Sequence, residues 1–375
     1  MKHKHTLRAI AFLVLAACGG GSDGPTTPTT PTTPTTPTTP TTPTTPTPTA
    51  STLRDLAAAK GRSFGVALDA RFFANDAAYD ALVAREFNMV VAGNVMKWET
   101  LNRNGRFTYR WANPDALVGF AQTNGMKVRG HTLAWHQQNP TWLTGTTWSA
   151  DTLRQLLKEH VDSVVGHYKG KIHAWDVVNE ALNDGSGSLR TTGSPWAPTL
   201  GREYIDVAFT EARRVDPGAL LFYNDYSLEF PGAKQDSAFA LIQGMKARNV
   251  PIDGIGFQAH LQVGGGATAP SRQTLVNTFT RFAALGLKIE ITELDVRVPT
   301  PGATAADLAA QAKAYADVVG ACLDVSACDA ILVWGVNDGE SWINTTFPGW
   351  GQALLFDDAF GKKATYNAVR SALGG

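Results

Sequence analysis

The sequence predicts an α/β protein built on a single (β/α)8 barrel, preceded by a signal peptide and a disordered Pro-Thr linker. Three observations favour this fold. Short β-rich apolar runs alternate with longer helical patterns throughout residues 51–375, and eight such units fit in about 325 residues. The first predicted strand is followed by Ala70-Arg71-Phe72-Phe73 rather than by a glycine-rich phosphate loop, which disfavours a doubly wound sheet.

The first segment, residues 1–17, has the pattern of a secretory signal, with a basic start and a short apolar run from Ala9 to Ala17. It ends in Leu15-Ala16-Ala17-Cys18, which resembles a bacterial lipoprotein cleavage box with Cys18 as the lipidated residue. Ordinary cleavage that leaves Cys18 as a free thiol is the alternative. No apolar run reaches the length of about 18 residues that a membrane-spanning helix needs. We therefore expect a secreted protein whose only membrane contact is a lipid anchor at Cys18, on the outer membrane or the cell surface of a bacterial envelope.

The second segment, residues 18–50, is a linker dominated by a Pro-Thr-Thr repeat from Pro25 to Pro48, which holds nine of the 20 prolines of the chain. It has no apolar side chains to bury, so it is expected to stay disordered with a preference for extended polyproline II. Its reach of up to about 75 Å would hold the following domain clear of an anchoring surface.

The third segment, residues 51–375, contains the predicted strands and helices of the barrel. The strands are Phe64–Asp69, Met89–Gly93, Lys127–His131, Ala174–Asn179, Leu220–Asn224, Gly254–Gln258, Lys288–Leu294 and Ile331–Val336. The clearest helices between them are Asp151–Tyr168, Gly201–Val215, Ala233–Arg248, Gln273–Leu285 and Ala305–Val319. Since the catalytic residues of such barrels lie where strands end, the polar residues at those positions are candidates for a site. They are His131, Asn179, Glu180, Asn224, Asp225, Gln258, His260, Glu293 and Asp295, with Trp334 at the last strand.

Two carboxylates in this set indicate the chemistry. Glu180 and Glu293 each end an apolar run, where an exposed salt bridge is not the natural explanation. A single glutamate there would more often be a satisfied rim residue, but two on opposed strands favour catalysis. Paired carboxylates, one protonated and one ionised, are what hydrolysis of an acetal requires.

The surrounding residue types suit a sugar chain. Trp135, Trp334 and Trp342 offer flat faces for pyranose rings, although any single tryptophan could equally be a core residue. Hydroxyl groups could be bound by the side chains of Asn94, Lys97, His131, Gln138, Asn179 and Gln258.

Composition excludes several other classes of function. The 33 basic and 33 acidic residues balance, which argues against nucleic acid as a partner. The chain has no His-Glu-x-x-His and no zinc-type cysteine spacing, so we expect neither a metal nor a cofactor. It also lacks a Gly-x-Ser-x-Gly elbow.

Several motifs together resemble the endo-β-1,4-xylanases of glycoside hydrolase family 10. They are Asn94-Val95-Met96-Lys97-Trp98, Arg129-Gly130-His131-Thr132-Leu133-Ala134-Trp135-His136, Trp175-Asp176-Val177-Val178-Asn179-Glu180, Tyr223-Asn224-Asp225-Tyr226, Gly256-Phe257-Gln258-Ala259-His260, Ile291-Thr292-Glu293-Leu294-Asp295, and Trp334-Gly335-Val336-Asn337-Asp338 with Ser341-Trp342. They cover residues 60–373 in the order of the family.

The resemblance implies a retaining endo-hydrolase that cleaves internal bonds of xylan and acts on xylan and xylo-oligosaccharides. We expect the protein to be a monomer. Glu180 would be the general acid/base and Glu293 the nucleophile that forms the glycosyl-enzyme. Asn179 would bind the 2-hydroxyl of the sugar, and His260, oriented by Asp295, would hold Glu293. The substrate would be bound by Asn94, Lys97, His131, Trp135, Gln138, Asn224, Tyr226, Gln258, Trp334 and Trp342. Retention implies that the two carboxyl groups lie about 5–5.5 Å apart.

Gly93 departs from the family pattern, in which a glutamate usually precedes Asn94 and contacts a xylose hydroxyl one subsite beyond the cleavage point. Losing a charged hydrogen bond costs about 1.5–3 kcal/mol. We therefore expect weaker binding of short oligomers and unchanged cleavage chemistry.

The same resemblance implies a disulfide between Cys322 and Cys328, because the family often has a bridge just before its eighth strand. Two reduced thiols are the alternative. A disulfide agrees with an exported protein.

Two other functions remain open from the sequence. The first is a β-1,4-glucanase on the same barrel, for which the hydroxymethyl group of glucose would have to fit beside Lys97, Gln138 and Trp342. The second is a non-catalytic glycan-binding lipoprotein, which the presence of both Glu180 and Glu293 disfavours.

Overall fold

A closed ring of eight parallel strands forms the centre of the part of the chain that the computed structural model describes, residues 51–71 and 73–375. The strands are β1 (Ser63–Leu68), β2 (Met89–Ala92), β3 (Lys127–Ala134), β4 (Ala174–Asn179), β5 (Leu220–Asp225), β6 (Gly254–Phe257), β8 (Lys288–Pro299) and β9 (Cys328–Val333). Each strand pairs in parallel with the next, and β9 pairs with β1 from Ser63↔Ala330 to Val66↔Val333. The ring has no open edge, and the predicted (β/α)8 barrel is confirmed. The predicted signal peptide, linker and Cys18 lie outside the described residues.

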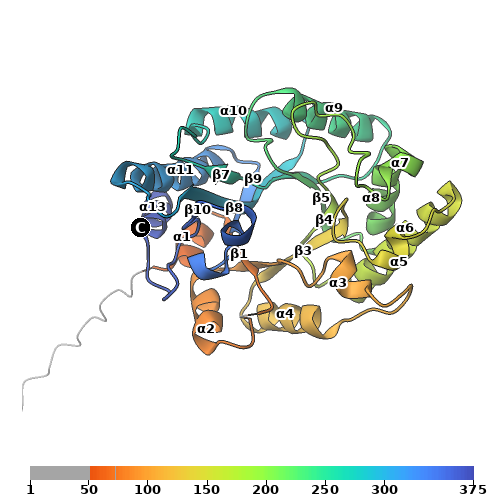
Figure 1. The fold of residues 1–375 in the computed structure, drawn as a ribbon, viewed down its shortest axis with the longest axis horizontal. Helices are drawn as coiled ribbons and strands as arrows, with labels where there is room; N and C mark the ends of the chain where they lie inside the picture. The colour runs from red at the N-terminus through yellow and green to blue at the C-terminus, as the bar shows by residue number, and fades with distance from the viewer. Residues whose placement is uncertain (1–50, 72) are drawn as a thin grey trace, which may run out of the picture. The chain divides into compact units, whose positions relative to one another are not determined.

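The helices surround this ring of strands (Figure 1). They are α1 (Leu53–Ala59), α2 (Ala77–Glu86), α3 (Trp98–Asn102), α4 (Ala112–Thr123), α5 (Thr141–Thr144), α6 (Ala150–His167), α7 (Ala197–Leu200), α8 (Glu203–Val215), α9 (Ala233–Ala247), α10 (Arg272–Ala283), α11 (Ala305–Asp324), α12 (Ile343–Thr346) and α13 (Ala364–Ala372), with a short 3-10 helix η1 (Asp338–Glu340). Several helices have a side-chain N-cap. At the start of α6, for example, the Ser149 hydroxyl accepts a hydrogen bond from the Thr152 N–H. None of these described helices is long and apolar enough to cross a membrane.

Three strands, β3, β8 and β9, differ from the prediction by three residues or more at an end, and the other strand ends agree to within one residue. β3 continues past His131 because Ala134 pairs with Val178 of β4 after a register shift. β8 continues past Leu294 because its far half pairs with the additional strands β7 (His260–Gln262) and β10 (Trp350–Gly351). β9 begins at Cys328 and ends at Val333, three residues before the predicted end at Val336. The main chain turns there at Gly335, whose φ of 134° suits glycine.

The two ends of the described chain meet at one buried carboxylate. Glu86, at the end of α2, accepts hydrogen bonds from the Leu53 N–H of α1 at 3.2 Å and from the Tyr366 hydroxyl of α13 at 2.9 Å. Only 1% of Glu86 is exposed, so the pairing with these donors offsets its desolvation. The first and last helices are thereby joined at the same part of the barrel.

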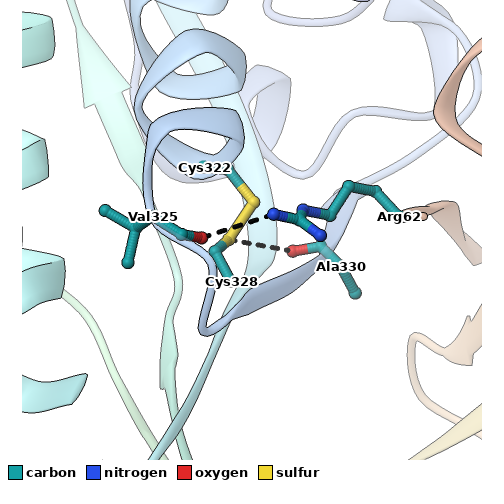
Figure 2. Close-up of a disulfide and its surroundings, with 5 residues drawn as sticks. All are labelled: Arg62, Cys322, Val325, Cys328 and Ala330. Atoms are coloured by element: carbon teal, nitrogen blue, oxygen red, sulfur yellow. Dashed lines mark hydrogen bonds between the residues drawn. A yellow bond between two sulfur atoms is a disulfide. The ribbon is translucent and has the colours of Figure 1, made fainter. Parts of the chain in front are cut away.

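A disulfide joins Cys322, in the last turn of α11, to Cys328, the first residue of β9. The bridge that the resemblance implied is therefore confirmed. Figure 2 shows it beside Val325, whose main-chain oxygen accepts a hydrogen bond from Arg62 at 3.5 Å. Both cysteines are fully buried. Because the bridge lies at the amino end of β9, it is on the face of the barrel opposite to the carboxyl ends of the strands.

The double variant Cys322→Ala/Cys328→Ala should lower the free energy of unfolding by about 2 kcal/mol, because the bond closes a loop with a sequence separation of 6. Equilibrium unfolding in urea measures the difference. The oxidised protein should unfold at higher urea than the same protein reduced, and the reduced protein should match the double variant. If wild type and variant unfold at the same urea concentration, the bridge adds no stability.

Candidate active site

A cleft of about 750 Å³ lies at the carboxyl ends of the strands. Most of the residues proposed from the sequence line it, namely Asn94, Lys97, His131, Trp135, Gln138, Asn179, Glu180, Tyr226, Gln258, His260, Glu293, Trp334 and Trp342. Asn224 and Asp295 are fully buried and do not line the cleft; they lie behind residues that do. The residues predicted from the sequence therefore meet at one cleft, although they lie in or after strands from β2 to β9.

Glu180 follows the last residue of β4 and has a left-handed backbone conformation, with φ of 55°. A non-glycine residue rarely adopts this region, and doing so costs about 1–3 kcal/mol unless the surroundings fix it. Its N–H donates to the Asn224 main-chain oxygen of β5 at 2.9 Å. The conformation turns the Glu180 side chain out of the strand and toward the cleft.

Three side-chain donors hold the Glu180 carboxyl group. The Trp135 indole N–H donates to Oε2 at 2.8 Å, and the Gln258 amide donates to Oε1 at 2.9 Å. The Asn179 amide donates to Oε1 at 3.1 Å. Glu180 as a whole is 9% exposed. These donors therefore fix its carboxyl group, while one side of the residue still faces the cleft.

Glu293 is connected to Glu180 through two amides. The Asn224 amide nitrogen donates both to Glu293 Oε1 at 2.7 Å and to Asn179 Oδ1 at 2.8 Å. The Thr292 hydroxyl donates to Asn224 Oδ1 at 2.7 Å and so fixes which way this amide points. Gly256 is required beside it, because a Cβ at that position would lie 2.2 Å from Asn224 Oδ1.

His260 joins Glu293 to a second carboxylate. Its Nε2 lies 3.1 Å from Glu293 Oε2, and its Nδ1 lies 2.9 Å from Asp295 Oδ2. Burial opposes a charge on the ring, but Asp295 and Glu293 outweigh it and raise the pKa of His260 to about 10. The imidazolium donates to both carboxylates. It lowers the pKa of Glu293 against the opposing effect of burial, so Glu293 is ionised.

One wall of the cleft is built from β2, β3 and the segments that follow them. Lys97 is 7% exposed, its Nζ donates to Asn94 Oδ1 at 3.1 Å, and it lies 4.9 Å from the centre of the Trp135 ring. Burial lowers the pKa of Lys97, partly offset by Glu293 and Glu180. The Gln138 amide reaches the same Asn94 oxygen at 3.4 Å. This wall presents several polar groups at fixed positions beside an indole face.

Gly93 lines the cleft at the end of β2. A Cβ at this position would meet only the main chain of Leu68, whose oxygen would lie at 3.1 Å and whose carbonyl carbon at 3.8 Å. The expected weakening of short-oligomer binding stays a prediction.

Further residues line the cleft that the sequence analysis did not single out, namely Asp69, Gln137, Asp184, Ser227, Arg297, Glu340 and Phe347. Asp69 directly follows β1, so the strand-end pattern could have found it. Gln137 and Ser227 directly neighbour Gln138 and Tyr226, which the sequence did indicate. Arg297 lies in the extended half of β8, Glu340 in η1, and Asp184 and Phe347 in loops, where no local pattern indicates the cleft.

The arrangement defines a class of protein. An ionised carboxylate and a second carboxyl group face one open cleft on a (β/α)8 barrel, with indole faces and amides around them, as glycoside hydrolysis requires. Residues 52–372 match the profile of Glycosyl hydrolase family 10. The chain belongs to this family.

Similar proteins agree with that assignment. The chain is 43% identical over 316 residues to "Endo-1,4-beta-xylanase 5" of Pyricularia oryzae, covering 83% of this chain and 75% of that protein. It is 42% identical over 295 residues to "Endo-1,4-beta-xylanase B" of Thermotoga neapolitana, covering 79% and 83%. The solved structure of xylanase 10B from Thermotoga petrophila, in complex with xylobiose, is 40% identical with a TM-score of 0.82, covering 86% of this chain and 97% of that one.

The charge on His260 should make stability depend on pH. Its pKa is raised from 6.5 to about 10 in the folded protein, so its contribution is complete below about pH 6.5 and is lost as the pH rises through about 10. The variant His260→Gln should therefore be less stable than the wild type at pH 6.5. This difference in the free energy of unfolding should shrink by roughly 1–3 kcal/mol between pH 6.5 and 10.5, after allowance for solvent screening. Urea unfolding at several pH values measures it.

His173→Gln is the matched control, because His173 lies just before β4 and burial lowers its pKa to about 4. It is neutral over the whole range, so its effect should not change with pH. A constant difference for His260→Gln would show that His260 is not protonated in the folded protein.

Proposed function

We propose that this chain is a retaining endo-β-1,4-xylanase, in which Glu293 is the nucleophile and Glu180 is the general acid/base. The observation that carries the proposal is the difference between the two carboxyl groups. Glu293 is paired with an imidazolium that keeps it ionised, whereas Glu180 is held only by neutral donors. An ionised nucleophile beside a carboxyl group without a cationic hydrogen-bond partner is what double displacement needs.

In the first step, a Glu293 oxygen bonds to the anomeric carbon while the bond from that carbon to the glycosidic oxygen breaks. Glu180 gives its proton to the departing oxygen, and the glycosyl-enzyme ester is left. The Asn179 amide donates to Glu180 and accepts from the Asn224 amide, which also donates to Glu293. Asn179 therefore lies between the two carboxyl groups, in position to bind a hydroxyl of the sugar at the nucleophile.

In the second step, water attacks the anomeric carbon and Glu180 takes the proton of the water. The bond to Glu293 breaks, and the sugar leaves with the configuration of the substrate. His260 donates to Glu293 as that carboxylate is released, so its charge is stabilised at the end as at the start.

Two findings support xylan as the substrate. The similar proteins from Pyricularia oryzae and Thermotoga neapolitana are named endo-1,4-beta-xylanases, and the structure from Thermotoga petrophila holds xylobiose. In this chain, Lys97 and Gln138 both contact the Asn94 side-chain oxygen, and the hydroxymethyl group that distinguishes glucose from xylose would have to fit beside them.

NMR of the anomeric protons during digestion of xylan tests the reaction, with residues 51–375 alone and without added metal. We expect the β-anomer to form first, and Glu293→Ala to release no product, because the covalent intermediate cannot form. Glu293→Ala should still bind xylo-oligosaccharides, which calorimetry can check.

Each other outcome has a separate meaning. If the α-anomer forms first, the double-displacement mechanism is wrong. Cleavage of β-glucan without cleavage of xylan would keep the mechanism and change the substrate. No cleavage of either polymer, with binding retained, would favour a glycan-binding protein.

We also propose that Cys18 carries a lipid that anchors the protein at a bacterial envelope, through the linker of residues 18–50. The leader pattern supports this, and residues 51–375 form the catalytic domain. Expressed in a bacterium that processes lipoproteins, the full chain should incorporate labelled fatty acid and sediment with membranes. Cys18→Ser should remain soluble and unlabelled with the same xylanase activity. Membrane sedimentation of Cys18→Ser would contradict the anchor.

A further inference from the structure

Arg190 holds the main chain on both sides of Ala181 and has no part in the mechanism described so far. Its Nε donates to the Glu180 main-chain oxygen at 3.1 Å, and its Nη2 donates to the Leu182 main-chain oxygen at 2.8 Å. Its side chain is only 15% exposed. Two parallel contacts from one planar guanidinium fix the peptide groups of Glu180 and Leu182 relative to each other.

The segment that carries Arg190 folds back on itself directly after Glu180. The Arg190 N–H donates to the Ala181 oxygen at 2.7 Å, and Leu182 forms an antiparallel bridge with Leu189. Residues 181–190 therefore form a short hairpin that starts directly after Glu180. It ends at Arg190, whose side chain contacts the Glu180 main chain.

The same guanidinium reaches the segment that follows β5, the strand that pairs with β4. Its Nη2 also donates to the Tyr226 hydroxyl at 3.1 Å, and that hydroxyl donates to Asp184 Oδ2 at 2.7 Å. Tyr226 and Asp184 both line the cleft. Arg190 thus joins the main chain of Glu180, the hairpin and the segment after β5 in one set of hydrogen bonds.

From these contacts we infer that Arg190 is a positioning residue for the acid step. It holds Glu180 in its left-handed conformation and so fixes where the proton of the Glu180 carboxyl group is delivered. This inference rests on the proposed role of Glu180. The unusual φ of Glu180 needs such support, because the conformation persists only where its surroundings determine it.

Leaving-group chemistry separates this role from a general effect on folding. A phenol leaving group of ordinary basicity needs a proton as its bond breaks, whereas 2,4-dinitrophenolate leaves without one. A misplaced acid therefore slows only the first kind of substrate. The ratio kcat/KM reports the first step alone.

The experiment measures kcat/KM for phenyl and 2,4-dinitrophenyl β-xylobiosides in the wild type and in Arg190→Met, which keeps the apolar stem and removes every donor. We expect the phenyl substrate to lose roughly ten- to a hundredfold, the cost of a small misplacement, and the dinitrophenyl substrate to be unchanged. Arg190→Lys keeps one donor group and should recover part of the loss. If Arg190→Met does not fold, Arg190→Lys carries the test with the same selectivity.

Arg213→Met is the matched control. Its guanidinium also donates to two main-chain oxygens, those of Pro217 and Ala219, both at 2.9 Å, but at the amino end of β5. It should show no selectivity between the two substrates.

Glu180→Ala separates failure of the inference from failure of the proposed function. It should lose about 10²–10⁴-fold on the phenyl substrate alone. If Glu180→Ala is selective but neither arginine variant is, the inference about Arg190 is wrong. If Glu180→Ala slows both substrates equally, the assignment of Glu180 as the acid is wrong.

Discussion

The parallel pairing of β9 with β1 is the constraint on which the rest of the structure depends. Once the sheet closes with all strands parallel, their carboxyl ends meet at one face, whatever the distance between them in the sequence. Glu180 after β4 and Glu293 in β8 are more than a hundred residues apart, yet hydrogen bonds link them. Asn224 donates to Glu293 and to Asn179, and Asn179 donates to Glu180. An open sheet would keep neighbouring strand ends together but could not bring opposed strands to one cleft. Closure therefore makes a two-carboxylate site possible.

Within the cleft, position and charge are set by different groups. The amides of Asn179, Asn224 and Gln258 link the two carboxyl groups and fix their geometry without adding charge. The cation that donates to a glutamate of this network is His260, which contacts Glu293 and is anchored by Asp295. The Trp342 indole N–H donates to the same Asp295 oxygen at 2.8 Å. Because this cation pairs with Glu293 and not with Glu180, two glutamates in a common network can be given opposite tasks.

The sequence alone predicted the barrel, the order of its strands and most of the cleft, because both depend on local patterns. Apolar runs mark strands, and a polar residue after such a run faces the carboxyl end of the barrel. The strand ends of β3, β8 and β9 were misplaced, since they depend on partners distant in the chain, as β7 does for β8. Arg190 was not found at all. Its partners are the main-chain oxygens of Glu180 and Leu182, and a bond to main chain leaves no mark in residue type.

Charge buried deep in the barrel also contributes to the cleft. Arg129, fully buried in β3, donates to Asp176 of β4 and to Glu290 of β8, the latter at 2.5 Å. Such buried ion pairs seldom add net stability, because desolvation cancels most of the attraction, but removing one partner leaves an uncompensated charge. Asp176 uses the same oxygen that accepts from Arg129 Nε to contact Nδ1 of His131, at 3.0 Å. His131 lines the cleft, so the ion pair fixes the orientation of a side chain that faces the substrate. The buried charges therefore serve to position His131 in the cleft rather than to add net stability.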